Sequence, residues 1–243
     1  RSTLFPYTTL FRSLADTNAA ATRALLPNFD PFLTDEGFRD GIVEPDRNKV
    51  LSPPKQPKGE AVPPPLFRFA GNALFSLPVG DAADDFEWNG IHYRLFRTAD
   101  GWVISMQQRQ HHYLLRATHD WQRAETDLSL TAGEEEPFIN NFLSVTFGLA
   151  TASLHTLKVH ASVTELNGRA LLFLGKSGTG KSTHSSLWHR FVPGCTLLND
   201  DEPVVRIGDD GVVRVYGTPW SGKTPCYLCQ RSEERRVGKE CRS

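Results

Sequence analysis

The chain has 243 residues, and its 27 lysine and arginine residues nearly balance its 28 aspartate and glutamate residues, so its formal net charge is −1. This balance argues against a general nucleic-acid-binding protein, which would carry a surplus of basic residues, and we expect no nucleic-acid partner. No apolar run reaches the length that spans a membrane, and we expect no membrane association.

The two ends of the chain are related through their codons. Residues 1–13 and 231–243, paired in reverse order, can all be written with complementary codons, so one short DNA read on opposite strands encodes both segments. The implied DNA also resembles a common sequencing adapter. We therefore predict that both segments are translated adapter sequence without a function, and we exclude them from the fold argument.

Residues 14–230 remain, a reading frame in which Met106 is the only methionine, and we expect both true termini to be missing. Without the ends, 20 basic residues stand against 25 acidic ones, a net charge of −5. The three remaining cysteines are too few for a disulfide scaffold and are typical of a reducing compartment, so we expect a cytoplasmic location. Two of them, Cys226 and Cys229, have the spacing of half a metal site, but the absence of a second pair predicts no metal there.

Two regions without a functional motif come first in the remaining sequence. Residues 14–65 form an irregular segment in which residues 52–65 carry six prolines, and this stretch is expected to be an exposed linker or long loop. Residues 66–131 are predicted to form antiparallel β-structure, with tight turns at Asn89-Gly90 and Asp100-Gly101.

A helix is predicted within residues 134–161. Acidic residues and Pro137 stand where a helix begins, and apolar residues recur at three- and four-residue steps. The residues of this predicted apolar face are Phe138, Phe142, Val145, Leu149 and Ala152.

The strongest signal is a glycine-rich loop. An apolar strand, ALLFL, leads into GKSGTGKS (175–182), which matches the pattern G-x-x-x-x-G-K-[ST], and a plausible helix follows. In this pattern the backbone N–H groups surround phosphate oxygens, the lysine reaches the β- and γ-phosphates, and the hydroxyl binds Mg²⁺. The sequence therefore predicts nucleotide binding, with Lys181 and Ser182 in these two roles.

A second match to the pattern occurs at GTPWSGKT (217–224), but no helical pattern follows it. Two interpretations stay open. The segment is either a second glycine-lined loop of the same cleft, with Lys223 as a further cation, or a tight surface turn.

Between the two loops, an apolar strand in residues 195–207 ends in Asn199-Asp200-Asp201-Glu202. Carboxylates at a strand end beside a phosphate loop can bind Mg²⁺ and accept a proton from a hydroxyl nucleophile. Hairpins are predicted on both sides, with turns at Asn167-Gly168 and Asp210-Gly211. A hairpin that feeds the phosphate loop departs from the all-parallel sheet of small GTPases and ATPases.

Taken together, HAS…LLFLGKSGTGKSTHSSLW…LLNDDEPVVRI…VYGTPWSGKTPCY resembles the HPr serine kinase/phosphorylase and phosphoenolpyruvate carboxykinase superfamily, over about residues 158–227. The resemblance implies an α/β fold. Its phosphate-loop nucleotide-binding core would be of the phosphoenolpyruvate-carboxykinase-like type with a mixed or antiparallel sheet, would occupy residues 134–230 without its C-terminal part, and would follow a mostly β N-terminal region.

The resemblance also implies the site. ATP would be bound by the glycine loop, and Mg²⁺ by Ser182 together with one aspartate of the Asp200-Asp201 pair, while the other aspartate would activate the acceptor hydroxyl. We favour Asp200 as the base and Asp201 as the metal ligand. His160 takes the position of a histidine near the phosphates, or is a structural residue. The ATP-binding residues are Gly175, Lys176, Ser177, Gly178, Thr179, Gly180, Lys181, Ser182 and Thr183.

These residues favour an ATP-dependent kinase that phosphorylates a hydroxyl of an unknown protein or small-molecule acceptor, and they are compatible with a homo-oligomer. Two alternatives stay open: an ATP-dependent carboxykinase-like enzyme, and a nucleotide-binding module without catalysis. Because the C-terminal part is expected to be missing, these 243 residues are expected to be weakly active or inactive.

Overall fold

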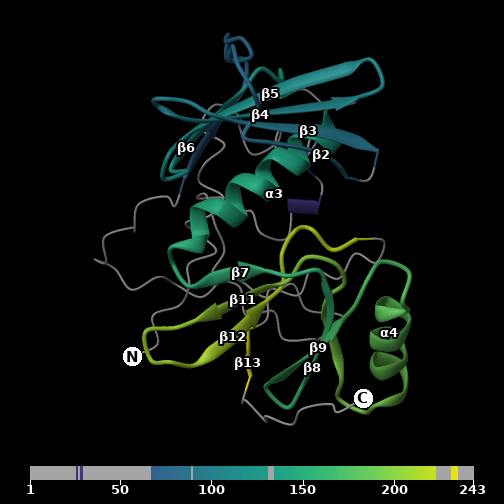
Figure 1. Cartoon of the computed structure of the whole chain (residues 1–243). Helices are drawn as coiled ribbons and strands as arrows, with labels where there is room; N and C mark the ends of the chain where they lie inside the picture. The colour runs from purple at the N-terminus through teal and green to yellow at the C-terminus, as the bar shows by residue number, and fades with distance from the viewer. Residues whose placement is uncertain are drawn as a thin grey trace. The chain divides into compact units, whose positions relative to one another are not determined.

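The computed structural model describes residues 26, 28–29, 67–88, 90–130 and 134–222, and the backbone of residues 231–234 (Figure 1). The chain divides into two compact units. Unit 1 consists of residues 1–40 and 54–151, and unit 2 of residues 41–53 and 152–243.

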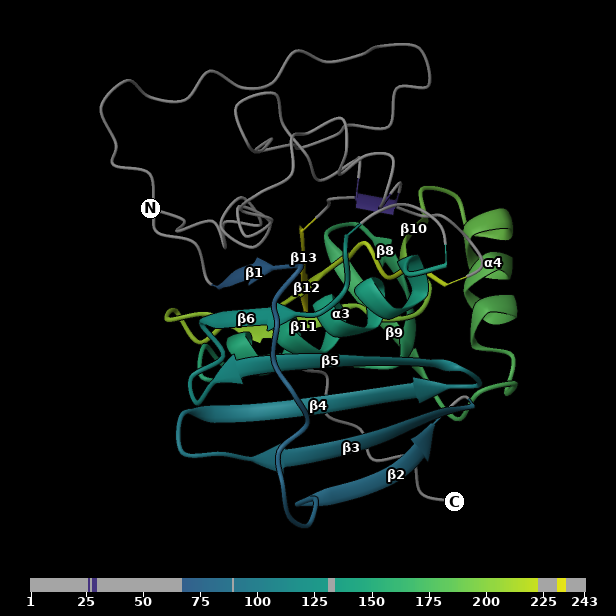
Figure 2. The ribbon, with the colours of Figure 1, turned by 90° about the horizontal axis from the view of Figure 1, so that it is seen from above.

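Unit 1 is built on a six-stranded sheet in the order β1-β6-β5-β4-β3-β2, whose long strands β2 to β5 lie side by side in Figure 2. All neighbouring strands are antiparallel except β1 and β6. The pairings of β2 with β3 and of β3 with β4 confirm the two hairpins predicted around Gly90 and Gly101. The strands are β1 (Arg68–Ala70), β2 (Asp84–Trp88), β3 (Ile91–Arg97), β4 (Gly101–Gln108), β5 (His111–Thr118) and β6 (Arg123–Thr126).

Helix α3 (Glu136–Ala152) confirms the predicted helix. It packs on the sheet of unit 1, where the ring centroids of Phe138 and of Tyr113 on β5 lie 4.7 Å apart in an edge-to-face arrangement. Its buried face differs from the predicted one. Leu149 is 44% exposed, whereas Phe142 and Phe147 are fully buried. The buried residues of the helix are Phe138, Ile139, Phe142, Leu143, Ser144, Thr146, Phe147, Ala150 and Thr151.

Unit 2 contains two separate antiparallel sheets, one in the order β10-β8-β9 and the other in the order β13-β12-β11-β7. Four fully buried side chains from both sheets, Ala161, Val163, Leu198 and Val215, form a common core. The elements are β7 (Thr156–Lys158), β8 (Ala161–Leu166), β9 (Arg169–Leu174), α4 (Lys181–Phe191), β10 (Thr196–Asn199), β11 (Val204–Ile207), β12 (Val213–Tyr216) and β13 (Arg231–Glu234).

The pairing in unit 2 confirms the predicted hairpins that turn at Asn167-Gly168 and Asp210-Gly211. Strand β13 pairs antiparallel with β12, and it begins at residue 231, where the second segment excluded from the fold argument begins.

The predicted α/β fold with a phosphate-loop nucleotide-binding core is wrong. The described residues are mostly β, with three sheets and only two helices, α3 and α4, one in each unit. Strand β9, which leads into the glycine loop, stands at the edge of a three-stranded antiparallel sheet. The physical reason is that local patterns predict a strand, a loop and a helix, whereas the partner of each strand is decided by contacts distant in sequence.

In the described residues no helix is both long enough and apolar enough to cross a membrane. The predicted linker at residues 52–65 and the two cysteines Cys226 and Cys229 lie outside the described residues.

Candidate functional site

The glycine loop connects β9 to α4 and is exposed from Gly175 to Gly180. Gly178 and Gly180 have φ angles of +80° and +87°, in the left-handed region that glycine adopts without strain. The loop closes on itself, because the backbone N–H of Thr179 donates to the carbonyl of Lys176 at 3.3 Å and its hydroxyl donates to the same carbonyl at 2.8 Å.

Helix α4 begins directly after this loop, and Gly180, its N-terminal capping residue, provides no side-chain hydrogen bond to the first turn. The first turn carries no acidic residue either. The N–H groups and the positive end of the helix dipole are therefore available to an anion, as the sequence pattern predicts for a phosphate.

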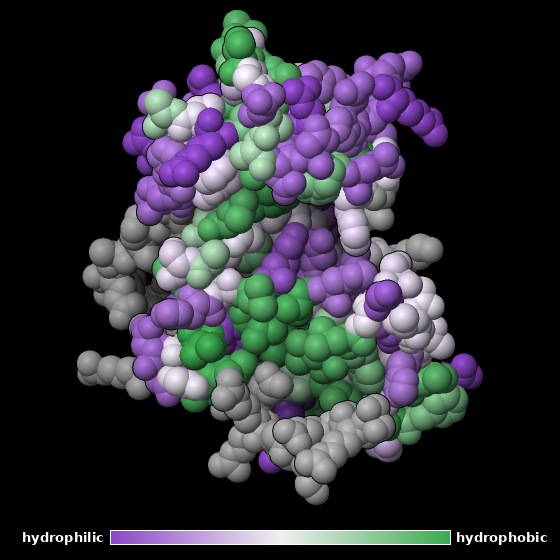
Figure 3. Space-filling model, in the orientation of Figure 1, coloured by the Kyte–Doolittle hydropathy of each residue, from purple (hydrophilic) through white to green (hydrophobic). Residues whose placement is uncertain are grey.

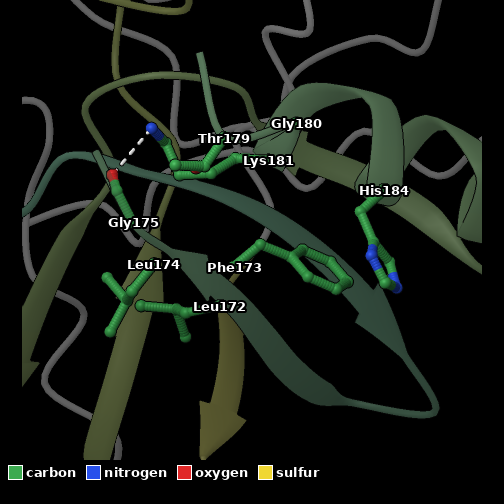
Figure 4. A pocket seen from close by; sticks show the side chains of 8 residues that line it. All are labelled: Leu172, Phe173, Leu174, Gly175, Thr179, Gly180, Lys181 and His184. Carbon is green, nitrogen blue, oxygen red and sulfur yellow. Dashed lines mark hydrogen bonds between the residues drawn. The ribbon is translucent and has the colours of Figure 1, made fainter. Parts of the chain in front are cut away.

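Lys181 lies over the loop, and its Nζ donates to the carbonyl of Gly175 at 2.9 Å (Figure 4). It also donates to the carbonyl of Lys176 at 3.1 Å. Beside it is an open hollow of about 420 Å³. The rings of Phe173 and His184, 4.9 Å apart, face one another on its wall. The lining residues are Leu172, Phe173, Leu174, Gly175, Thr179, Gly180, Lys181 and His184. A phosphate could replace the two carbonyls as the partner of the Lys181 ammonium group.

The carboxylate pair stands at the end of β10, and Asn199 holds it in place. The fully buried Asn199 side chain accepts the N–H of Asp201 at 3.1 Å and donates to the carbonyl of Thr218 at 3.0 Å. Asn199 therefore joins the strand end to the chain segment that begins the second loop.

Asp200 and Asp201 have different surroundings. Residue Asp200 is 7% exposed, whereas the side chain of Asp201 is 42% exposed. His160 Nε2 lies 3.5 Å from Asp201 Oδ1. Burial, and after it the negative charge of Glu202, raises the pKa of Asp201, while the charges of His160 and Lys181 act in the opposite direction. Lys181 and His160 are thus both within electrostatic reach of Asp201.

A chain of buried hydroxyl groups connects Asp200 to helix α4. Ser162 on β8 donates from its Oγ to Asp200 Oδ1 at 2.7 Å, and the Oγ atoms of Ser162 and Ser185 are 2.5 Å apart. Ser185 is in turn 3.1 Å from the carbonyl oxygen of Ser182 in the first turn of α4. Both serine side chains belong to fully buried residues. The carboxylate pair and the glycine loop are therefore parts of one local structure.

The second glycine-containing segment also approaches the carboxylates. A Cβ atom placed on Gly222 would lie 3.1 Å from the carbonyl oxygen of Asp200 and 3.1 Å from Cβ of Asp201. Thr218 donates from its hydroxyl to the carbonyl of Glu202 at 2.8 Å. Of the two interpretations, this contact favours a loop of the same cleft, although Lys223 itself lies outside the described residues.

A magnesium ion would find few protein ligands here. Within the described residues, no three His, Cys, Asp or Glu side chains are grouped so that they could hold a metal ion. The two side chains that the resemblance assigns to Mg²⁺ are the hydroxyl of Ser182, in the exposed start of α4, and the half-exposed carboxylate of Asp201. Such a small oxygen donor set fits Mg²⁺, which keeps several waters and takes phosphate oxygens as ligands.

The structure thus brings together the loop residues, His160, Asp200 and Asp201, which the sequence predicted as one site. No sequence pattern predicted a role for Ser162 and Ser185, which link the parts. Ser162 lies in the quoted HAS segment and Ser185 in GKSTHSSLW, but a serine in a strand or helix carries no signal by itself.

Comparison with models of protein families gives no match to the chain, and comparison with curated proteins gives none either.

Proposed function

We propose that the protein binds Mg-ATP at the glycine loop and that the complete protein transfers the γ-phosphoryl group to a hydroxyl of a protein or small molecule. The observation that supports this proposal best is the link between loop and carboxylates, because Asp200 is two hydrogen bonds away from α4 through Ser162 and Ser185. A phosphoryl-transfer site needs such closeness, since the base must reach a hydroxyl that is in line with the bound phosphate.

In the proposed reaction the loop N–H groups and Lys181 hold the phosphates. The acceptor hydroxyl oxygen bonds to the γ-phosphorus, the bond from that phosphorus to the β,γ-bridging oxygen breaks, and ADP leaves with the electron pair. The hydroxyl proton passes to the carboxylate of Asp200. Mg²⁺, held by Ser182 and Asp201, would supply positive charge that offsets the charge of the phosphate oxygens.

The surroundings of the carboxylates give less support to a carboxykinase. An oxaloacetate-like dianion needs several cationic side chains that are not already paired with carboxylates. The basic side chains around the acidic cluster Asp200-Asp201-Glu202 are largely paired with it. Lys158 pairs with Glu202 at 2.8 Å and His160 lies 3.5 Å from Asp201, which leaves Lys181 for the phosphates. The charge of the cluster therefore suits a neutral hydroxyl better than a dianion.

The test is Mg-ATP binding by calorimetry, followed by phosphate release, on the 243-residue chain. Lys181→Ala should weaken Mg-ATP binding at least about tenfold, because a charge-assisted contact is worth more than about 1.4 kcal/mol. Arg190→Ala is the matched control, since it removes a charge from the exposed last turn of the same helix, and it should bind as the wild type does. Unchanged binding by Lys181→Ala would refute the assignment of the loop.

Asp200→Asn separates the remaining functions. For a kinase it should preserve Mg-ATP binding and lower the slow release of phosphate to water. Binding of Mg-ATP by the complete protein without turnover on any acceptor would indicate a non-catalytic module. Consumption of ATP that depends on oxaloacetate and yields phosphoenolpyruvate would indicate the carboxykinase alternative.

A further inference from the structure

We propose that Ser162 and Ser185 are positioning residues that fix the carboxylate of Asp200, so that one of its oxygens is held and the other faces the acceptor hydroxyl. This inference rests on the proposed function and adds to it two residues from β8 and α4. Asp200 Oδ1 accepts the hydrogen bond from Ser162 at 2.7 Å, and no hydrogen bond to Oδ2 occurs in the described part of the structure.

The direction of the hydrogen bonds follows from the number of hydrogen atoms. An ionised carboxylate has no proton to donate, and each serine hydroxyl has one. Ser162 therefore donates its hydroxyl hydrogen to Asp200. In the 2.5 Å contact between the two hydroxyls, Ser185 must then be the donor and Ser162 the acceptor. Ser185 can then donate to Ser162 or to the carbonyl of Ser182, but not to both at once.

Burial makes this chain of bonds important for the geometry. Ser162 and Ser185 are fully buried and Asp200 is 7% exposed. Water therefore has little access to Asp200 to replace the hydrogen bond from Ser162. A hydrogen bond to a charged group in such a place is stronger than one between neutral groups, and an unmade one costs more. The rotamer of Asp200, and with it the direction of Oδ2, is thus held through β8 by helix α4.

Helix α4 gives a second reason to assign a role to Ser185. Of its eleven residues, Ser185 is the one that is buried, while large apolar side chains such as Leu187 and Phe191 are 48% and 66% exposed. Figure 3 shows that apolar side chains also gather on the surface of unit 2. The buried contact of α4 with the sheet therefore centres on a polar side chain. Burying the Ser185 hydroxyl lowers stability unless the hydroxyl makes a hydrogen bond.

The test compares variants of equal volume. Ser162→Val removes the hydroxyl and Ser162→Thr keeps it, while both add a branched side chain that a strand accepts. Thr164→Val is the matched control, because Thr164 lies on the same face of β8, is 1% exposed and directs its hydroxyl to Cys195 instead of Asp200. The measurements are the Kd of Mg-ATP and the single-turnover rate of phosphate release from Mg-ATP, both on the full chain.

We expect Ser162→Val to lower the rate about tenfold with a Kd within about twofold of the wild type, and Ser162→Thr to restore most of the rate. Ser185→Ala should lower the rate by a smaller factor, since Ser162 keeps its own hydrogen. Thr164→Val should change neither quantity. Equal rates for the Val and Thr variants, or parallel losses of rate and affinity, would overturn the positioning role.

A nucleotide-free measurement separates failure of this inference from failure of the proposed function. In a double-mutant cycle of Ser162→Val and Asp200→Ala, the equilibrium constant of unfolding should show a coupling of about tenfold. Coupling within about twofold of unity would overturn the inference even if Mg-ATP binds. Strong coupling in a wild type that does not bind Mg-ATP would overturn the proposed function, and the catalytic role of the serines with it.

Discussion

Gly178 in the glycine loop offers a test of whether the observed loop conformation is the one that binds phosphate. Its φ angle is +80°, and a Cβ atom placed on it would have no heavy atom within 4 Å. Gly178→Ala therefore introduces no collision, and its cost is purely that of a left-handed backbone at a residue with a side chain.

Gly211 provides the matched control, because it has a φ angle of +72° and equally open space, but lies in the hairpin turn between β11 and β12. A left-handed alanine costs about 1–2 kcal/mol. Part of this is offset by about 0.4–1 kcal/mol from the lower entropy of the unfolded chain. Each variant should lose about 1 kcal/mol of stability, or about 3 °C in Tm by thermal unfolding.

The two variants should differ in Mg-ATP binding measured by calorimetry. If the loop with a left-handed residue 178 is the binding conformation and the free loop of the alanine variant relaxes to another one, the cost of about 1 kcal/mol raises the apparent Kd up to about fivefold; if the free loop does not relax, the same cost is seen as lost stability. Gly211→Ala should leave the Kd unchanged. A Gly178→Ala chain that keeps both the stability and the Kd of the wild type would refute this role of the loop, as would a Gly211→Ala chain with a changed Kd.

Two further outcomes test the packing and the charges of unit 1. Phe142→Ala should lower the free energy of unfolding by about 3–5 kcal/mol, whereas Leu149→Ala, on a side chain that is 44% exposed, should change it far less; similar losses in denaturant titrations would contradict the buried face of α3. Burial raises the pKa of Asp127 above its ordinary value of 3.8, so this residue favours the folded state most below that value and loses the contribution as the pH rises through its raised pKa. Asp127→Asn should therefore be relatively more stable than the wild type at neutral pH than near pH 3, and a difference between the two chains that does not change with pH would contradict this sign.

The hairpins were predictable because their signals are local. Asn-Gly and Asp-Gly supply the positive φ angles of a tight turn within two residues, and Asn167 and Gly168 have φ angles of +53° and +75° in the turn between β8 and β9. The choice of sheet is a different question, since β8 pairs with β9 next to it in the chain but also with β10. This second pairing depends on side chains that the turn does not determine.

Helix α3 shows the limit of apolar periodicity. The sequence predicts the helix correctly, but the predicted face contains Leu149 and omits Thr146 and Thr151, which are 0% and 1% exposed. Thr151 is accommodated because its hydroxyl donates to the carbonyl of Phe147 at 2.8 Å, one turn earlier. A threonine whose hydroxyl is hydrogen-bonded within its own helix can be buried like an apolar residue. A periodicity that counts apolar residues alone omits such a threonine and predicts a different buried face.

The candidate site could be predicted where one residue type has one chemical use, and not where the use depends on a neighbouring residue. A glycine loop followed by a lysine and a hydroxyl, with carboxylates about twenty residues later, predicts a site with Lys181, Asp200 and Asp201 without a structure. Ser162 and Ser185 become meaningful only because two strands and a helix bring their hydroxyls to 2.5 Å and 2.7 Å contacts across 23 and 38 residues of chain. Since these contacts are what place the carboxylate beside the loop, the part of the site that the sequence could not predict is also the part that joins its predicted pieces.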